Sequence, residues 1–151
     1  MRIARYISLL VLSALYIPAY GASFDNKAPD EQMISALEQR AAQAQPREQC
    51  FLYAQLVHEM IEFSAQQYAA GEADKASGWL KKAQEFTHKL HGALAVNDKK
   101  LKDAQILLRH TAFRLTELLH SGNSEDQELV QETLAQLNQA QNEAMLQVFK
   151  K

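Results

Sequence analysis

Two pairs of residues in this sequence have a spacing that is used to hold metal ions. Glu85 and His88 are three residues apart, and Glu117 and His120 repeat the pattern later in the chain. In ferritin-like bundles such pairs project from helices into the interior and hold a di-metal centre. Whether these pairs can do so depends on which way the helices point them, and at what height.

The composition and the helix signals predict an all-α protein. Gly and Pro are scarce, with 5 and 3 copies in 151 residues, and the residues after the first 21 are rich in good helix formers. Pro29 suits the first position of a short helix. Pro46 either ends this helix or starts the next one. We expect four longer helices to follow, at residues 47–70, 73–93, 98–120 and 125–149.

Local signals mark the connections between these helices. Gly71 and Gly122 indicate turns, and Ser124 followed by Gln127 is a capping-box pattern that predicts the start of the last helix. No proline separates the third helix from the fourth, so residues 93–98 are either a break or a kink in one long helix.

Apolar residues recur at alternating steps of four and three in each long helix. The repeats are Cys50, Ala54, Val57, Ile61, Ser64 and Tyr68; Ala76, Leu80, Ala83, Thr87, Leu90 and Leu94; Leu101, Ala104, Leu108, Thr111, Leu115 and Leu118; and Val130, Leu134, Leu137, Gln141, Ala144 and Val148. An average of 3.5 residues is typical of left-handed, coiled-coil-like packing. The sequence therefore predicts an antiparallel four-helix bundle with a short extra N-terminal helix.

This geometry argues against a di-metal centre. At about 100° per residue, Glu85 and His88 point roughly 140–160° away from the apolar seam of their helix, and Glu117 and His120 lie similarly far from theirs. The two pairs should also differ in height by about 16–21 Å. We expect these side chains to be solvated and the protein to bind no metal or cofactor. The alternative is that His88 and His91 bind an adventitious metal ion at the helix surface.

Other catalytic and nucleic-acid signatures do not emerge from the sequence. There is no Cys-x-x-Cys-His haem motif, no glycine-rich phosphate loop and no Gly-x-Ser-x-Gly elbow, and His58-Glu59 has no second histidine at the zinc-protease spacing. The formal net charge of -2 becomes more negative if Arg2 and Arg5 are removed with a leader. An acidic chain argues against a nucleic-acid partner. We expect no enzymatic activity.

The N-terminal residues have the composition of a secretory signal. Arg2 and Arg5 precede an apolar run at residues 6–17, and Ala19 and Gly21 provide small residues for cleavage. The run is shorter than the roughly 20 residues of a membrane span, although an uncleaved anchor is the alternative. We expect a signal peptide at 1–21, a flexible arm at 22–28 and one bundle domain at 29–151. The protein would then be periplasmic or secreted, with no stable membrane anchor after cleavage.

Cys50 is the single cysteine, so an internal disulfide is impossible. Its position on the apolar seam of its helix favours a buried, inert thiol. An intermolecular bridge and a reactive thiol are the alternatives.

Each predicted seam contains one polar residue, and two of these would share a layer. Folding the helices about their turns places Thr87 beside Gln141, so that the hydroxyl and the amide could bond and offset the cost of burial. The alternative is a hydrated Gln141 at the edge of the seam.

Residues 64–83 resemble the tetratricopeptide-repeat helical hairpin. Ser64 lies seven residues before Gly71, and Ala76, Leu80 and Ala83 follow at the family's spacing. The sequence departs from the pattern at Gln67, where an aromatic residue is expected, and at His88, where the closing proline is expected. The resemblance implies a tight hairpin. It covers one unit, whereas a peptide-binding array needs at least three, and small-residue packing at a turn explains the same pattern.

The fourth predicted helix carries apolar residues opposite its seam. Ile106, His110 and Phe113 share that face, and the first helix is expected to cover them. If they stay exposed, they form a contact surface for a partner helix or a homodimer. The leading hypothesis is therefore an exported, non-enzymatic adaptor or self-associating module. The alternative is a small-ligand or metal carrier with an interior pocket near Thr87 and Gln141.

Overall fold

The structure is a computed structural model, and it describes residues 28–94, 99–121 and 125–150. The predicted signal peptide and most of the predicted arm lie outside these residues. The described residues form five α-helices and no strand, which confirms the all-α class. The helices are α1 (Glu31–Gln43), α2 (Pro46–Ala69), α3 (Ala73–Ala93), α4 (Leu101–His120) and α5 (Gln127–Phe149).

Three helix starts differ from their predicted positions by two or three residues, and one of them is that of α4, which begins at Leu101 instead of residue 98. Asp30 caps α1, because its Oδ1 accepts a 2.8 Å hydrogen bond from the backbone N of Met33, so Pro29 precedes the cap and is not the first helical residue. At α5 the N-cap is Asp126, two residues after the predicted Ser124. Pro46, by contrast, begins α2 directly, where its fixed φ suits the first turn.

The turn between α2 and α3 depends on Gly71 and on small residues. Gly71 has a φ of +81°, a conformation that favours glycine. The buried Ser64 hydroxyl donates a 2.8 Å hydrogen bond to the carbonyl of Ala76 on the facing helix. These features account for the hairpin-like spacing of residues 64–83 through local packing.

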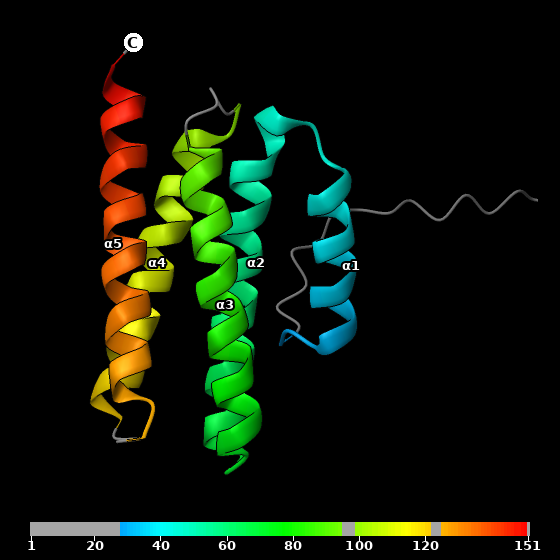
Figure 1. The fold of residues 1–151 in the computed structure, drawn as a ribbon, viewed down its shortest axis with the longest axis vertical. Coiled ribbons are helices and arrows are strands. Elements are labelled where there is room, and N and C mark those ends of the chain that lie inside the picture. The colour runs from blue at the N-terminus through cyan, green and yellow to red at the C-terminus, as the bar shows by residue number, and fades with distance from the viewer. Residues whose placement is uncertain (1–27, 95–98, 122–124, 151) are drawn as a thin grey trace, which may run out of the picture.

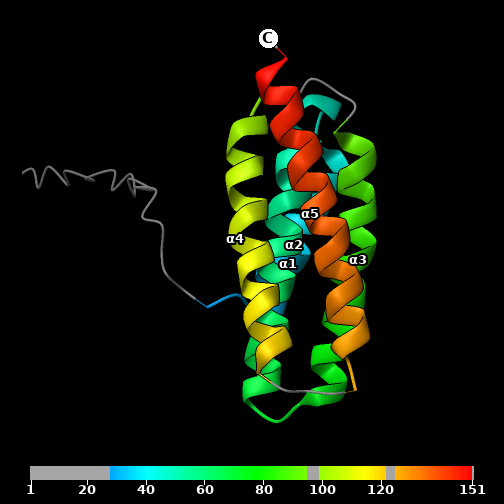
Figure 2. The same ribbon diagram turned by 90° about the vertical axis from the view of Figure 1, so that its left-hand side faces the viewer.

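α2 and α3 run in opposite directions along the molecule, and so do α4 and α5 (Figure 1, Figure 2). α2 contacts α1, α3 and α4, while α5 contacts α3 and α4. α3 and α4 are consecutive in the chain, yet their described residues make no contact with each other. As the colours show, α2 runs parallel to α4 and α3 parallel to α5 (Figure 1). α3 ends at Ala93 and α4 begins at Leu101, so they are two helices and not one kinked helix.

This packing changes the register between helices that are distant in the chain. Ser77 bonds to Asp126 and Gln84 to Glu132, so residues of α3 lie beside residues of α5 that follow them by 49 or 48 positions. Thr87 accordingly lies near Gln136 and not near Gln141, and its hydroxyl donates to the Ala83 carbonyl at 2.9 Å. The predicted Thr87–Gln141 layer is therefore wrong by about five residues, or about 7.5 Å along the helix.

The core follows the predicted seams closely in α2, α3 and α4. All six seam residues of α3 are buried, and so is Cys50 in α2. In α5 the buried line is rotated: Thr133 and Ala140 are buried, whereas Leu134 and Gln141 are half-buried. α5 contacts α3 and α4 but not α2, and contact with two neighbours shifts its buried face.

The short helix α1 packs on the side of α2 that faces away from α4 (Figure 1). Ile34 and Ala41 are its buried residues, whereas Met33, predicted to be in its apolar stripe, is exposed. Two ion pairs tie α1 to α3. Glu31 lies 2.7 Å from Lys75, and Glu38 lies 2.8 Å from Lys82.

Candidate functional site

The four residues of the Glu-x-x-His pairs are exposed. Glu85 and His88 lie on α3, and Glu117 and His120 lie on α4, two helices that do not contact each other in the described part of the chain. Glu117 forms a 2.9 Å ion pair with Arg114 of its own helix. The described residues contain no group of three or more His, Cys, Asp or Glu side chains arranged to hold a metal ion.

His88 and His91 lie beside a small cavity between α3 and α5. The cavity has a volume of about 120 Å³ and is also lined by Thr87, Gln136 and Gln139. His91 Nε2 lies 3.3 Å from Glu143 Oε2, so this histidine already faces a carboxylate. A cavity of this size is below the range of about 300–1,000 Å³ typical of ligand sites. The structure therefore does not provide a ligand-sized pocket at the predicted Thr87 layer.

The outer face of α4 remains uncovered by α1, contrary to expectation. Phe113 is 67 % exposed, Ile106 is 37 % exposed, and His110 is exposed. α1 covers α2 on the opposite side of the molecule from α4, because the apolar face of α2 is broad enough to contact three neighbours (Figure 1). We call Ile106, His110 and Phe113 the α4 face.

An open groove runs between α2 and α4 beside the α4 face. Its volume is about 870 Å³, and it is lined by His58, Glu62, Leu107, His110, Phe113, Arg114 and Glu117. Arg114 spans the groove, with its Nε 3.2 Å from Glu62 of α2 and its Nη1 2.9 Å from Glu117. These carboxylates raise the pKa of Arg114, the hydrogen bond to Glu117 contributing most.

His58 connects the two helices at the base of this groove. Its Nδ1 lies 3.0 Å from Thr111 Oγ1, and the Thr111 hydroxyl donates to the Leu107 carbonyl at 2.9 Å. The proton of Thr111 is thus used, so His58 must donate from Nδ1 when neutral. Burial lowers the pKa of His58, and His110 and Arg114 lower it further, while Glu62 opposes the shift. Thr111 is buried and its proton faces a backbone carbonyl, an arrangement unsuited to a nucleophile.

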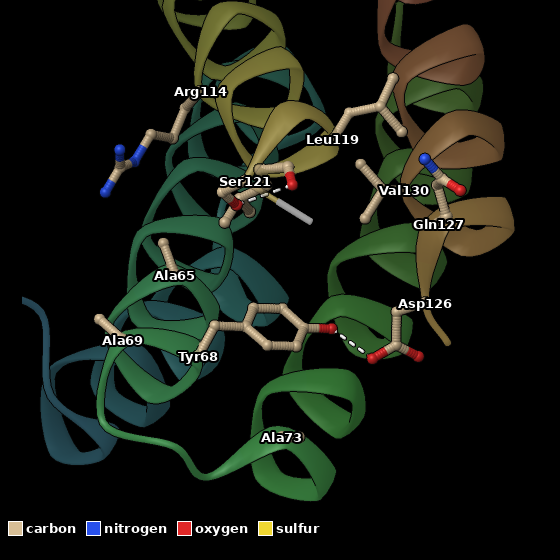
Figure 3. A pocket seen from close by; sticks show the side chains of 11 residues that line it. Ala65, Tyr68, Ala69, Ala73, Arg114, Leu119, Ser121, Asp126, Gln127 and Val130 are labelled. Atoms are coloured by element: carbon tan, nitrogen blue, oxygen red, sulfur yellow. Dashed lines mark hydrogen bonds between the residues drawn. The ribbon is translucent and has the colours of Figure 1, made fainter. Parts of the chain in front are cut away.

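A separate, more enclosed pocket lies at the end of the bundle near the α2–α3 turn and the start of α5. We call it the end pocket. It has a volume of about 470 Å³ and is lined by Ala65, Tyr68, Ala69, Ala73, Arg114, Leu118, Leu119, Ser121, Asp126, Gln127 and Val130. Figure 3 shows Tyr68 reaching from α2 to Asp126, and its hydroxyl donates a 2.5 Å hydrogen bond to Asp126 Oδ2. The Ser77 hydroxyl donates to Oδ1 of the same carboxylate at 2.9 Å.

Sequence reasoning missed the end pocket. Tyr68 was predicted as the last seam residue of its helix, and Asp126 fell within the predicted last helix, at residues 125–149. An acidic residue at the start of a helix is ordinarily a cap. Only the packing of α5 against α3 brings Asp126 within reach of side chains from α2 and α3.

The chain was compared with protein families, curated proteins and solved structures, and nothing matches in any of the three comparisons. The hairpin resemblance of residues 64–83 is therefore not accompanied by a family match. Among the described residues, no helix combines the length and apolar character required to cross a membrane.

Proposed function

We propose, since no family assigns a role by similarity, that this chain is an exported, non-enzymatic interaction protein that binds a partner through the α4 face. The partner is another protein or a second copy of this chain, and the scaffold is a four-helix bundle with α1 as its extra helix. The observation that carries the proposal is the exposure of Phe113, at 67 %, in the middle of a helix and beside an open groove.

The composition of this surface supports protein binding. Interfaces are enriched in aromatic residues and arginine, and their binding energy concentrates in a few anchors surrounded by polar groups. Phe113 would be the anchor, and Ile106, one heptad earlier, extends the apolar contact along α4. Arg114 and Glu117 would form part of the polar rim. Fully burying a phenylalanine side chain is worth about 1.5–3 kcal/mol, which a partner could gain here.

The binding proposal can be tested by site-specific photo-crosslinking. A photoreactive benzoyl-phenylalanine at position 113 of the full chain should give one discrete adduct in cells, whose mass distinguishes a second copy from another protein. The same probe at Glu85, which is exposed on α3, provides the control. Introducing Ile106→Asp beside the probe should abolish the adduct, because a charge would be buried in the contact. Identical adducts from positions 85 and 113, or none from 113, would contradict the proposal.

Self-association has its own test. Light scattering should show a dimer for the wild type and a monomer for Phe113→Asp, if the partner is a second copy. Phe149→Asp is the matched control, because Phe149 is 79 % exposed near the end of a different helix. A monomer in all three samples would rule out a homodimer and leave another protein as the partner.

Export is a separate part of the proposal and rests on residues 1–21. The mature protein recovered from cells is expected to begin at Ala22. Intact-mass measurement of the native protein checks this, and a mass that retains Arg2 and Arg5 would contradict it.

A further inference from the structure

The end pocket has the size and wall of a small-molecule site, and it is separate from the α4 face. Its volume of about 470 Å³ falls within the range of about 300–1,000 Å³ that such sites occupy. The larger part of its wall is apolar, and these residues are Ala65, Ala69, Ala73, Leu118, Leu119 and Val130. The alanines leave room in the pocket, because their side chains end at Cβ.

One carboxylate dominates the polar part of the wall. Asp126 accepts hydrogen bonds from the neutral hydroxyls of Tyr68 and Ser77, at 2.5 Å and 2.9 Å. Within the described ranges it forms no ion pair. Burial raises the pKa of Tyr68, and the hydrogen bond to and charge of Asp126 add to the shift, so this hydroxyl stays protonated and keeps donating.

The single cation of the wall does not neutralise Asp126. The guanidinium of Arg114 is paired with Glu62 at 3.2 Å and with Glu117 at 2.9 Å. Figure 3 shows its side chain pointing away from Asp126. The pocket therefore presents a negative charge, an aromatic ring and an apolar floor, without an internal positive charge to balance them.

We propose that the end pocket binds a small organic amine, with its ammonium group on Asp126 and its apolar body against the alanine and leucine side chains. A carboxylate can accept about four hydrogen bonds, so Asp126 retains capacity after those from Tyr68 and Ser77. The ring of Tyr68 lines the same wall, and aromatic rings attract cations at close range. A neutral ligand of the same shape would gain neither an ion pair with Asp126 nor a cation–π contact with Tyr68, and an anion would be repelled.

The inference can be tested with three probes of similar shape and different charge. Phenethylamine, 2-phenylethanol and 3-phenylpropanoate are each titrated into the purified protein by calorimetry, and amide shifts of Ser77, Asp126 and Gln127 are followed by NMR. Phenethylamine is expected to bind at least about tenfold more tightly than the alcohol, because only the amine adds an ion pair and a cation–π contact. The carboxylate is expected not to bind.

Variants separate the pocket from general attraction of a cation to an acidic protein. Asp126→Asn should weaken phenethylamine binding at least about tenfold and remove the preference over the alcohol. Ala69→Trp adds a bulky side chain to the wall of the pocket, and it should block binding while the protein stays folded by circular dichroism. Asp103→Asn, which removes an exposed carboxylate at the opposite end of α4, should leave binding unchanged.

Three results would overturn the inference: equal affinities for the three probes, an amine affinity unchanged in Ala69→Trp, or shifts spread over the surface instead of the end pocket. This outcome is independent of the α4 face, because crosslinking at position 113 does not involve the Tyr68–Asp126 wall.

Discussion

Tyr68 and Asp126 are 58 residues apart in the chain, and their 2.5 Å hydrogen bond joins α2 to α5. These two helices lie diagonally across the bundle, and the described residues of α2 and α5 do not pack against each other. With Ser77 bound to the same carboxylate, Asp126 connects three helices at one end of the molecule. Tyr68 is therefore as much a part of the architecture as of the pocket.

The first prediction concerns this bond. Tyr68→Phe should lower the free energy of unfolding by about 1–2 kcal/mol, the range for a hydrogen bond to a charged group that is partly exposed to water. Combined with Asp126→Asn, the two changes should be non-additive by about 1 kcal/mol. Urea denaturation at pH 7 measures both. Tyr53→Phe is the control, because the structure describes no hydrogen bond for that hydroxyl, and equal losses in the two Tyr→Phe variants would contradict the assignment.

The second prediction compares two glycines. Gly71→Ala should destabilise the protein by about 1–2 kcal/mol, because residue 71 has a φ of +81° that alanine adopts at a cost. Gly78 lies exposed inside α3, and a Cβ added there meets no atom within 4 Å. Gly78→Ala should therefore stabilise the protein by about 0.5–1 kcal/mol through helix propensity. Thermal denaturation of both variants should give shifts of opposite sign, and shifts of the same sign would argue against the α2–α3 turn.

The third prediction concerns pH and His58. Burial lowers the pKa of His58 below its ordinary value of 6.5, so the unfolded chain binds this proton more readily. The fold favours the neutral form of His58. The stability of the fold is therefore not reduced by this group above about pH 6.5, and it decreases as the pH falls from there through the folded pKa. The free energy of unfolding should therefore rise between pH 5 and pH 7 more steeply in the wild type than in His58→Gln.

A second titrating group acts in the opposite direction near His58. Burial raises the pKa of Glu59 above 4.5, and Glu62 adds to the shift. The fold therefore favours the protonated Glu59, and the stability from this group is lost as the pH rises through its folded pKa. Because Glu59 is present in both proteins, the difference between wild type and His58→Gln isolates the histidine. His120→Gln, a change at an exposed site, should retain the wild-type slope. Equal slopes in wild type and His58→Gln would contradict a partly buried His58 with a lowered pKa.

The fourth prediction concerns Cys50, which is fully buried in α2. A thiol reagent such as Ellman's reagent should react with it at least about a hundredfold more slowly in the folded protein than in urea, because reaction requires opening of the core. A non-reducing gel should show no disulfide-linked dimer. Rapid labelling of the folded protein, or a reducible dimer, would mean that α2 is exposed in solution.

Much of the local structure could be predicted from the sequence, because helix signals act over a few residues. The seam of α3 and the burial of Cys50 follow from the apolar spacing, and Pro46 and Gly71 mark a helix start and a turn. The exposure of Glu85 and His88 follows from the same helical phase. The fold class and the elements were thus accessible, while the starts of α1, α4 and α5 were displaced by two or three residues.

The candidate sites were less accessible. Ile106, His110 and Phe113 could be placed on one face of a helix, but their exposure depended on where α1 packs. The end pocket could not be anticipated, because neither Tyr68 nor Asp126 carries a distinctive local motif. Their meeting requires α5 to lie beside α3, which no local signal specifies.

The sequence alone determined which residues are helical and which side of each helix is apolar, because both are short-range properties of a 3.5-residue repeat. Only the tertiary structure decided which apolar sides meet. Hydrophobic burial is non-directional, so the apolar seam of α4 could be buried against α2 and α5 as well as against its chain neighbour α3. That choice set the register that places Thr87 near Gln136, left Phe113 exposed and brought Tyr68 to Asp126.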